Sequence, residues 1–234
     1  METFEKIVLN IPHSSTRNGT MFWENEKQIE KKIKRWTDFK TDILFSPCDA
    51  VKDRVSSVVF GYSRFYVDVE RLVFDPLEKV GQGRIYEQFE DARRGTIPIE
   101  ERGLMLGLYE QHLNNLSKET TDKTLLIDCH SFPSDISDVE VCIGYNEDWS
   151  KPSKELIDAV KSIFEEQGYK VGMNEPYSNS ITPSRGKYKS LMLEINKRTY
   201  LNEETNELHG DFYKIGNLIN KAYRMILGKS TTPA

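Results

Sequence analysis

The stretch Leu125-Leu126-Ile127-Asp128-Cys129-His130-Ser131-Phe132 passes from an apolar run into a carboxylate and, two residues later, an imidazole. Such a run is typical of a buried strand, and α/β sheets place their chemistry at the carboxyl ends of strands. The segment Ile7-Val8-Leu9-Asn10-Ile11-Pro12-His13 repeats the design near the N-terminus. Two of the four histidines therefore follow strand-like runs. This pairing predicts a metal site.

Strand-like and helix-like segments alternate along the rest of the chain. Short runs rich in Val, Ile, Leu or aromatic residues predict strands at 6–11, 55–61, 65–69, 124–129, 139–145 and 190–195. Apolar residues at three- and four-residue spacing predict helices over 24–45, from Pro98 through Leu104, Leu108 and Leu116, over 152–167 and over 206–227. The alternation predicts a three-layer α/β sandwich with helices on both faces of a mixed, largely parallel sheet.

Composition limits the class of protein. A chain of 234 residues is long enough for one large α/β domain, and we expect residues 1–234 to form a single domain. A net charge of −5 gives no general attraction for nucleic acid. No window approaches the roughly 18 apolar residues of a membrane helix, and residues 1–6 lack the apolar core of a signal peptide. We therefore expect a cytoplasmic protein with three reduced cysteines.

His13 and His130 are the candidate metal ligands. Catalytic zinc sites generally take three protein ligands and leave one position for water. The third ligand would be Asp38 or Asp42, the nearest acids on the helix that follows, and we prefer Asp38. Asp42 is then either the competing ligand or an outer partner of the site. The alternative is that each histidine only satisfies the hydrogen bonds of its own loop.

Asp128 and Cys129, two further residues of the central run, are expected to have different roles. Asp128 and His130 are two apart, so on a strand both side chains point to one face, whereas Cys129 points to the other. Asp128 is therefore placed to orient the imidazole. Cys129 is placed to be a buried structural residue rather than a nucleophile, because a thiolate needs a base within hydrogen-bond reach.

Glu194 lies inside the apolar run Leu191-Met192-Leu193-Glu194-Ile195. An acid is rarely buried without a partner, so Glu194 either pairs with a cation or faces a cavity. A carboxylate beside a metal site can act as the general base of hydrolysis. The sequence leaves catalysis and structural pairing open for this residue.

Two arginines flank the predicted strand at 65–69. Arg64 and Arg71 are suited to hold a substrate carboxylate, because the planar guanidinium binds carboxylates bidentately. The alternative is surface ion pairing of both arginines with Asp68 and Glu70.

Five segments, from about residue 6 to 201, contain these polar residues: Ile11-Pro12-His13-Ser14-Ser15, Thr37-Asp38-Phe39 with Asp42, Ser63-Arg64 through Asp68-Val69-Glu70-Arg71, Asp128-Cys129-His130-Ser131-Phe132, and Leu193-Glu194-Ile195 with Tyr200. In this order they resemble the N-formylglutamate amidohydrolase family, which is related to zinc carboxypeptidases and aspartoacylases. The resemblance implies a zinc-carboxypeptidase-like fold with one catalytic Zn²⁺.

The resemblance also implies a role for each residue. Zinc would lie on His13 and His130, with Glu194 as the base that activates water. Arg64 and Arg71 would surround the substrate carboxylate, with Arg64 also serving in catalysis. The related carboxypeptidases use a His-x-x-Glu pair, but Thr16 occupies the corresponding place, so the third ligand must come from elsewhere, and Asp38 fits the family's own acidic motif.

Glu70 is a second departure, because relatives often have asparagine before the arginine that corresponds to Arg71. An acid at this position would repel an anionic substrate unless it is neutralised.

The predicted function is zinc-dependent hydrolysis of the amide of a small N-acyl amino acid such as N-formylglutamate. The alternatives are a non-catalytic metal-binding protein of the same fold and a carboxypeptidase-like peptidase. Of the remaining polar residues, His112 is expected to be partly exposed on a helix and His209 to lie at the surface. Arg185 and Lys187 are loop cations that either reach the substrate or face water.

Overall fold

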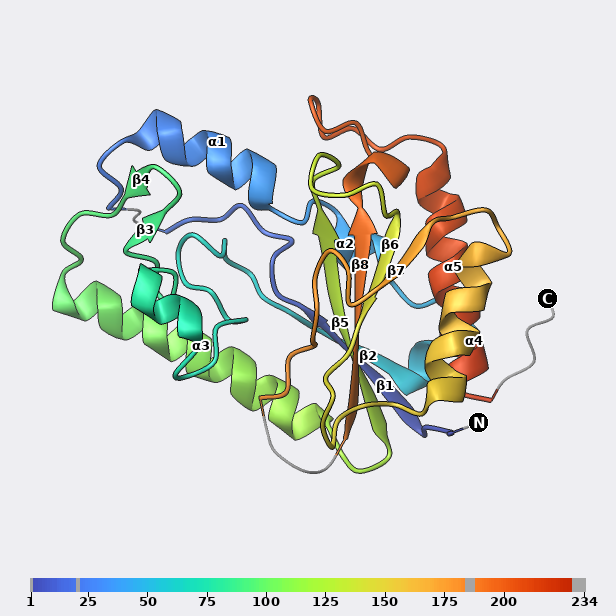
Figure 1. The fold of residues 1–234 in the computed structure, drawn as a ribbon. Coiled ribbons are helices and arrows are strands. Elements are labelled where there is room, and N and C mark those ends of the chain that lie inside the picture. Colours follow the sequence, from blue (N-terminus) through green and yellow to red (C-terminus); the bar gives the residue numbers. More distant parts are fainter. Residues whose placement is uncertain (1, 20–21, 184–187, 229–234) are drawn as a thin grey trace.

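The computed structural model describes residues 2–19, 22–183 and 188–228. Within this part of the chain, one six-stranded sheet runs through the middle, and helices flank it on both sides (Figure 1). The predicted α/β fold with a mixed, largely parallel sheet is therefore confirmed. Arg185 and Lys187 lie outside the described residues. No helix in the described ranges is both long enough and apolar enough to cross a bilayer.

The central sheet has the strand order β2-β1-β5-β8-β6-β7. Its strands are β1 (Lys6–Ile11), β2 (Val55–Val59), β5 (Thr124–Phe132), β6 (Val141–Gly144), β7 (Val171–Met173) and β8 (Lys189–Asn196). All neighbouring strands are parallel except β6 and β8, which are antiparallel. A separate hairpin joins β3 (Gln88–Phe89) and β4 (Ala92–Arg93). The carboxyl ends of β1, β5 and β8 consequently lie side by side.

The helices are α1 (Glu26–Trp36), α2 (Thr41–Leu44), α3 (Ile99–Glu119), α4 (Lys154–Glu165) and α5 (Asp211–Ile226), and three short 3-10 turns are η1 (Lys52–Arg54), η2 (Pro76–Val80) and η3 (Lys197–Thr199). Local signals set several boundaries. Ser153 caps α4 by accepting a hydrogen bond from the backbone of Leu156, and Asn25 caps α1 in the same way. Helices α4 and α5 cover one face of the sheet, and α3 lies on the other (Figure 1).

Alternation along the strands decides which face holds the polar residues. On β5, Leu125, Ile127 and Cys129 enter the larger core, which also contains the apolar faces of α4 and α5. Leu126 points to the opposite face and packs with Leu116 of α3. Since side chains alternate along a strand, Asp128 and His130 share the face of Leu126, and Cys129 is buried on the other side as expected.

Two predictions of secondary structure and one prediction of which helix face is buried are wrong. Residues 65–69 form turns rather than a strand, because this apolar run is buried by packing under α1 and α3 and not by strand pairing. The predicted helix over 24–45 is broken at Thr37–Lys40, where Lys40 adopts a left-handed φ of 64°. On α3, Leu104 is exposed, whereas Met105 and Tyr109 are buried. The short edge strand β7 was not predicted.

Candidate active site

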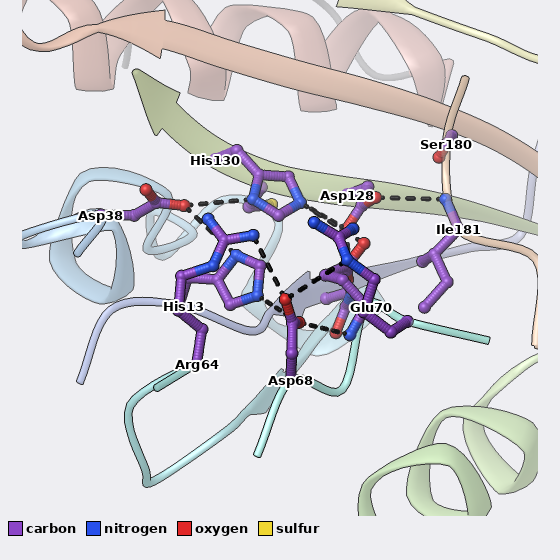
Figure 2. A network of polar contacts seen from close by, with 12 residues as sticks. His13, Asp38, Arg64, Asp68, Glu70, Asp128, His130, Ser180 and Ile181 are labelled. Atoms are coloured by element: carbon purple, nitrogen blue, oxygen red, sulfur yellow. Dashed lines mark hydrogen bonds and ion pairs between the residues drawn. The ribbon is translucent and has the colours of Figure 1, made fainter. Parts of the chain in front are cut away.

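The polar residues of the inner strands and of two loops meet at the carboxyl end of the sheet (Figure 2). His130 and Asp128 lie near the end of β5, and His13 lies two residues after the end of β1. Asp38 comes from the break between α1 and α2. All four side chains are buried, so each requires a polar or charged partner.

His13, Asp38 and His130 form the centre of this site. The Nδ1 atom of His130 lies 3.1 Å from Oδ2 of Asp38, and Nδ1 of His13 lies 3.8 Å from the same oxygen. The ligand atoms of the three residues all lie within 4.8 Å of one another. Nδ1 of His13 is buried and makes no hydrogen bond in the structure. Two imidazoles and a carboxylate converging in this way form a donor set that fits a divalent metal.

The backbone around Asp38 is held by several contacts. Its N–H donates to the carbonyl of His13 at 2.9 Å, and its own carbonyl accepts from the hydroxyl of Thr41 at 2.8 Å. Lys197, which is buried, donates to the carbonyl of Arg35 in the last turn of α1. Asp42, in contrast, lies on α2 with an exposed side chain, and the structure does not bring it into the cluster.

Each histidine has a carboxylate on its other ring nitrogen. Nε2 of His13 lies 2.8 Å from Oδ1 of Asp68, and Nε2 of His130 lies 3.1 Å from Oδ1 of Asp128. Carboxylates in this position fix the orientation of metal-binding histidines and increase their basicity. Both rings therefore present Nδ1 to Asp38 and Nε2 to an acid.

The ionisation of the cluster favours a positive charge at its centre. Burial and the neighbouring Arg64 lower the pKa of His13 to about 4, so its imidazole is neutral. Although burial opposes it, the carboxylates of Asp128 and Asp38 raise the pKa of His130 well above its usual value. The pKa of Asp38 is lowered, despite burial, by its contact with His130. The acids around His130 thus stabilise a cation at this position.

Glu194 stands beside His130 on the neighbouring strand. The two residues are paired in register between β5 and β8, so both side chains point to the same face. Glu194 is 9% exposed, and its Oε2 is buried without a hydrogen-bond partner. Burial raises its pKa to about 8. Next to the histidines and facing a cleft, this carboxyl group has the position that general base catalysis requires, and a metal cation at the site would favour its ionised, proton-accepting form.

The raised pKa of Glu194 predicts a pH-dependent stability of the metal-free protein. The folded protein keeps the proton between about pH 4.5 and 8, whereas the unfolded chain releases it, so the stability contribution of Glu194 falls as the pH rises through this range. A tenfold change in proton affinity corresponds to about 1.4 kcal/mol, so the loss amounts to several kcal/mol. In urea unfolding with a chelator, Glu194→Gln should gain stability relative to the parent from about pH 5 to about pH 9. Parallel stability curves would contradict the assignment.

Arg64 and Arg71 both approach one carboxylate. Nη2 of Arg64 lies 3.3 Å and Nε of Arg71 lies 3.7 Å from Oδ2 of Asp68, to which the hydroxyl of Tyr86 also donates. The ion pairing considered from the sequence is therefore present, but its carboxylate is buried and its arginines are only partly exposed, rather than lying at the surface. Both arginines also line the cleft. The sequence offered no signal that Asp68 would contact His13 and both arginines at once.

A second polar network joins Asn10 to Glu70, Asp128 and His112. The amide nitrogen of Asn10 donates to Glu70 at 2.6 Å and to Asp128 at 2.8 Å, while its carbonyl oxygen lies 2.8 Å from Nε2 of His112. His112 is buried, so the expectation that it is partly exposed was wrong, because α3 turns this residue toward the sheet. Burial and the nearby Asp128 raise the pKa of Glu70 well above its usual value. His209 lies near the surface, as expected.

The cluster opens into a cleft of about 830 Å³. Its lining includes His13, Asp38, His130, Glu194, Arg64, Glu70 and Arg71. Aromatic side chains from several segments, among them Trp36, Phe132 and Tyr177, contribute apolar surface. The cleft has the size of a small-molecule site, with polar groups at one end.

The sequence model of the N-formylglutamate amidohydrolase family matches residues 5–201, which is most of the chain. The chain belongs to this family. The match to the N-formylglutamate amidohydrolase family begins just before β1 and ends after η3, so it includes every residue of the cluster described above. The resemblance expected from the sequence is confirmed.

Two solved structures have the same fold as this member of the N-formylglutamate amidohydrolase family. An N-formylglutamate amidohydrolase from Ralstonia eutropha JMP134 superposes with a TM-score of 0.76 at 18% identity, over 97% of this chain and 94% of that one. The gene product Atu2144 from Agrobacterium tumefaciens gives 0.62 at 15% identity, over 96% and 91%. No functionally curated protein sequence matches the chain.

Proposed function

We propose that this protein is a zinc-dependent amidohydrolase that cleaves the amide bond of a small N-acyl amino acid, with N-formylglutamate as the reference substrate. The observation that supports it is the convergence of His13, Asp38 and His130 within 4.8 Å, with Glu194 paired in register beside His130. The family match supports the hydrolase class. We propose further that residues 1–234 act as one catalytic domain.

The donor set fits zinc. Two imidazoles and one carboxylate are ligands of catalytic zinc, which leaves a further position for water or substrate, and His130 would release its proton when the metal binds. Nδ1 of His13, buried and without a hydrogen bond, is accounted for if it holds the metal. When bound, Zn²⁺ would lower the pKa of a water ligand and polarise the substrate carbonyl.

The chain's own groups would do the rest of the chemistry. Glu194 would accept the proton of the attacking water at its unpaired Oε2 and return it to the leaving nitrogen, so that one carboxylate acts first as base and then as acid. Arg64 lies next to the cluster, where its guanidinium would stabilise the negative charge that develops on the carbonyl oxygen. Arg71 would help to bind the substrate carboxylate.

Elemental analysis combined with formate release tests this proposal. The purified protein should contain about one zinc per chain and should release formate from N-formyl amino acids, with activity lost on chelation and restored by Zn²⁺. Stoichiometric zinc without turnover of any acylated amino acid would favour a non-catalytic metal-binding protein. Because the cleft of about 830 Å³ is larger than an N-formyl amino acid needs, short peptides belong in the same assay, and preferential release of C-terminal residues would favour the peptidase alternative.

Asp128→Asn should weaken metal binding without abolishing it. The substitution keeps the shape of the side chain but removes the negative charge that lies 3.1 Å from Nε2 of His130. Loss of such an outer carboxylate typically lowers metal affinity by about 10- to 100-fold. Competition titration against a fluorescent zinc chelator measures this change. The matched control is Glu147→Gln, an exposed acid paired with Lys151, and an equal loss in both variants would remove Asp128 from this role.

A further inference from the structure

We propose that Glu70 determines specificity in this site by pairing with a positively charged side chain of the substrate. The substrate would be an N-acyl amino acid with one carboxylate and an ammonium or guanidinium group, rather than a dicarboxylate such as N-formylglutamate. This inference rests on the proposed hydrolysis of N-acyl amino acids and names the class of amino acid.

The carboxyl group of Glu70 is held at the wall of the cleft (Figure 2). The backbone N–H of Glu70 donates to Oδ1 of Asp68 at 2.9 Å, which fixes the residue next to the cluster. Its Oε1 accepts the amide of Asn10 at 2.6 Å, so one oxygen has a fixed partner. The side chain is 11% exposed. The second oxygen, Oε2, is therefore held in place beside the space that a substrate would enter.

Glu70 lacks a strong cationic partner among the described residues. Its one ion-pair contact is between Oε2 and Nε2 of His130, at 3.8 Å. That nitrogen lies closer to Asp128, at 3.1 Å. Asn10 also brings the carboxyl groups of Glu70 and Asp128 together, since its amide donates to both. A positive charge arriving from the cleft would relieve this unfavourable pair.

The arginines of the cleft do not compensate for Glu70. Arg64 and Arg71 both point toward Asp68, at 3.3 Å and 3.7 Å, so part of their charge is balanced inside the protein. On the side of the cleft where Glu70 lies, Asp128 is a second acid, joined to Glu70 through the amide of Asn10. One substrate carboxylate can still meet the two guanidinium groups. A second carboxylate placed beside Glu70 and Asp128 would face these two acids rather than a guanidinium group.

The test compares N-formyl-L-arginine, N-formyl-L-glutamine and N-formyl-L-glutamate. With the zinc-loaded protein, kcat/KM should fall in that order, with arginine over glutamate by about 10- to 100-fold, the range expected for a charge-assisted hydrogen bond. Glu70→Gln should reduce this ratio by a similar factor. Glu147→Gln is the matched control, because it removes the same charge from the solvent-screened rim of the cleft and should change the ratio little.

Binding measurements separate this inference from the proposed reaction. Calorimetry with the zinc-loaded Glu194→Gln protein, in which turnover should be about a thousandfold slower, gives affinities for N-formyl-arginine and N-formyl-glutamate, with and without Glu70→Gln. Tighter binding of the arginine compound that depends on Glu70, without hydrolysis by the parent protein, would contradict the proposed hydrolase reaction. The same result would support the role of Glu70 in specificity. Hydrolysis by a parent that prefers glutamate, with a ratio unchanged in Glu70→Gln and in Glu70→Asp, would overturn the role of Glu70.

Discussion

Replacing Glu194 by glutamine should lower kcat for formate release by about a thousandfold, because the amide cannot accept the proton of the attacking water. This corresponds to about 4 kcal/mol of activation free energy. Glutamine has the shape of the buried side chain, and Glu194 is not among the three residues whose ligand atoms converge. Zinc content and folding should therefore remain at the parent level. Single-turnover kinetics and metal analysis of the same preparation measure both quantities.

Two outcomes would count against the role of Glu194. Activity near the parent level would show that another group takes the proton. A loss of zinc that parallels the loss of activity would make Glu194 a metal ligand instead. Glu194→Asp is a useful companion variant, because it keeps the charge but shortens the reach, and it should retain part of the activity.

Asp38→Asn should lower zinc affinity by more than 100-fold, beyond the loss of about 10- to 100-fold that is typical for an outer partner. Its Oδ2 lies 3.1 Å and 3.8 Å from the Nδ1 atoms of the two histidines, so no other described carboxylate has the same position. Asp42→Asn is the matched control, since the same chemical change is made four residues away on an exposed side chain. Zinc titration of both variants should leave Asp42→Asn at the parent value. Equal losses of zinc affinity in the two variants would contradict the assignment of Asp38 as the third metal ligand.

Much of the fold could be predicted from local patterns. Strands β1, β5 and β8 are continuous apolar runs, because both of their faces are buried, and α4 and α5 have an uninterrupted apolar stripe. The polar residues of the site were visible for the same reason. An imidazole or carboxylate at the end of a buried strand stands out against its apolar neighbours, as His130 and Glu194 do.

Other features depend on contacts between distant segments, which periodicity does not reveal. The apolar run at 65–69 looks like a strand, but it is buried by Tyr86, Phe89 and α3 while its backbone turns. The break that places Asp38 depends on its hydrogen bond to the carbonyl of His13 and on Lys197, which lies far away in the sequence. The contact between Asp68 and His13 likewise depends on how the backbone turns at residues 65–69. The network of Asn10 with Glu70 and His112 likewise requires three segments to meet.

Anomalous X-ray diffraction from crystals of the zinc-loaded protein, recorded on both sides of the zinc absorption edge, tests the central claim most directly. We predict one peak per chain, at about 2.0 to 2.2 Å from Nδ1 of His13, from Nδ1 of His130 and from a carboxylate oxygen of Asp38. A peak that instead lies among Glu70, Asp128 and Nε2 of His130, or the lack of any peak in the cleft, would contradict it.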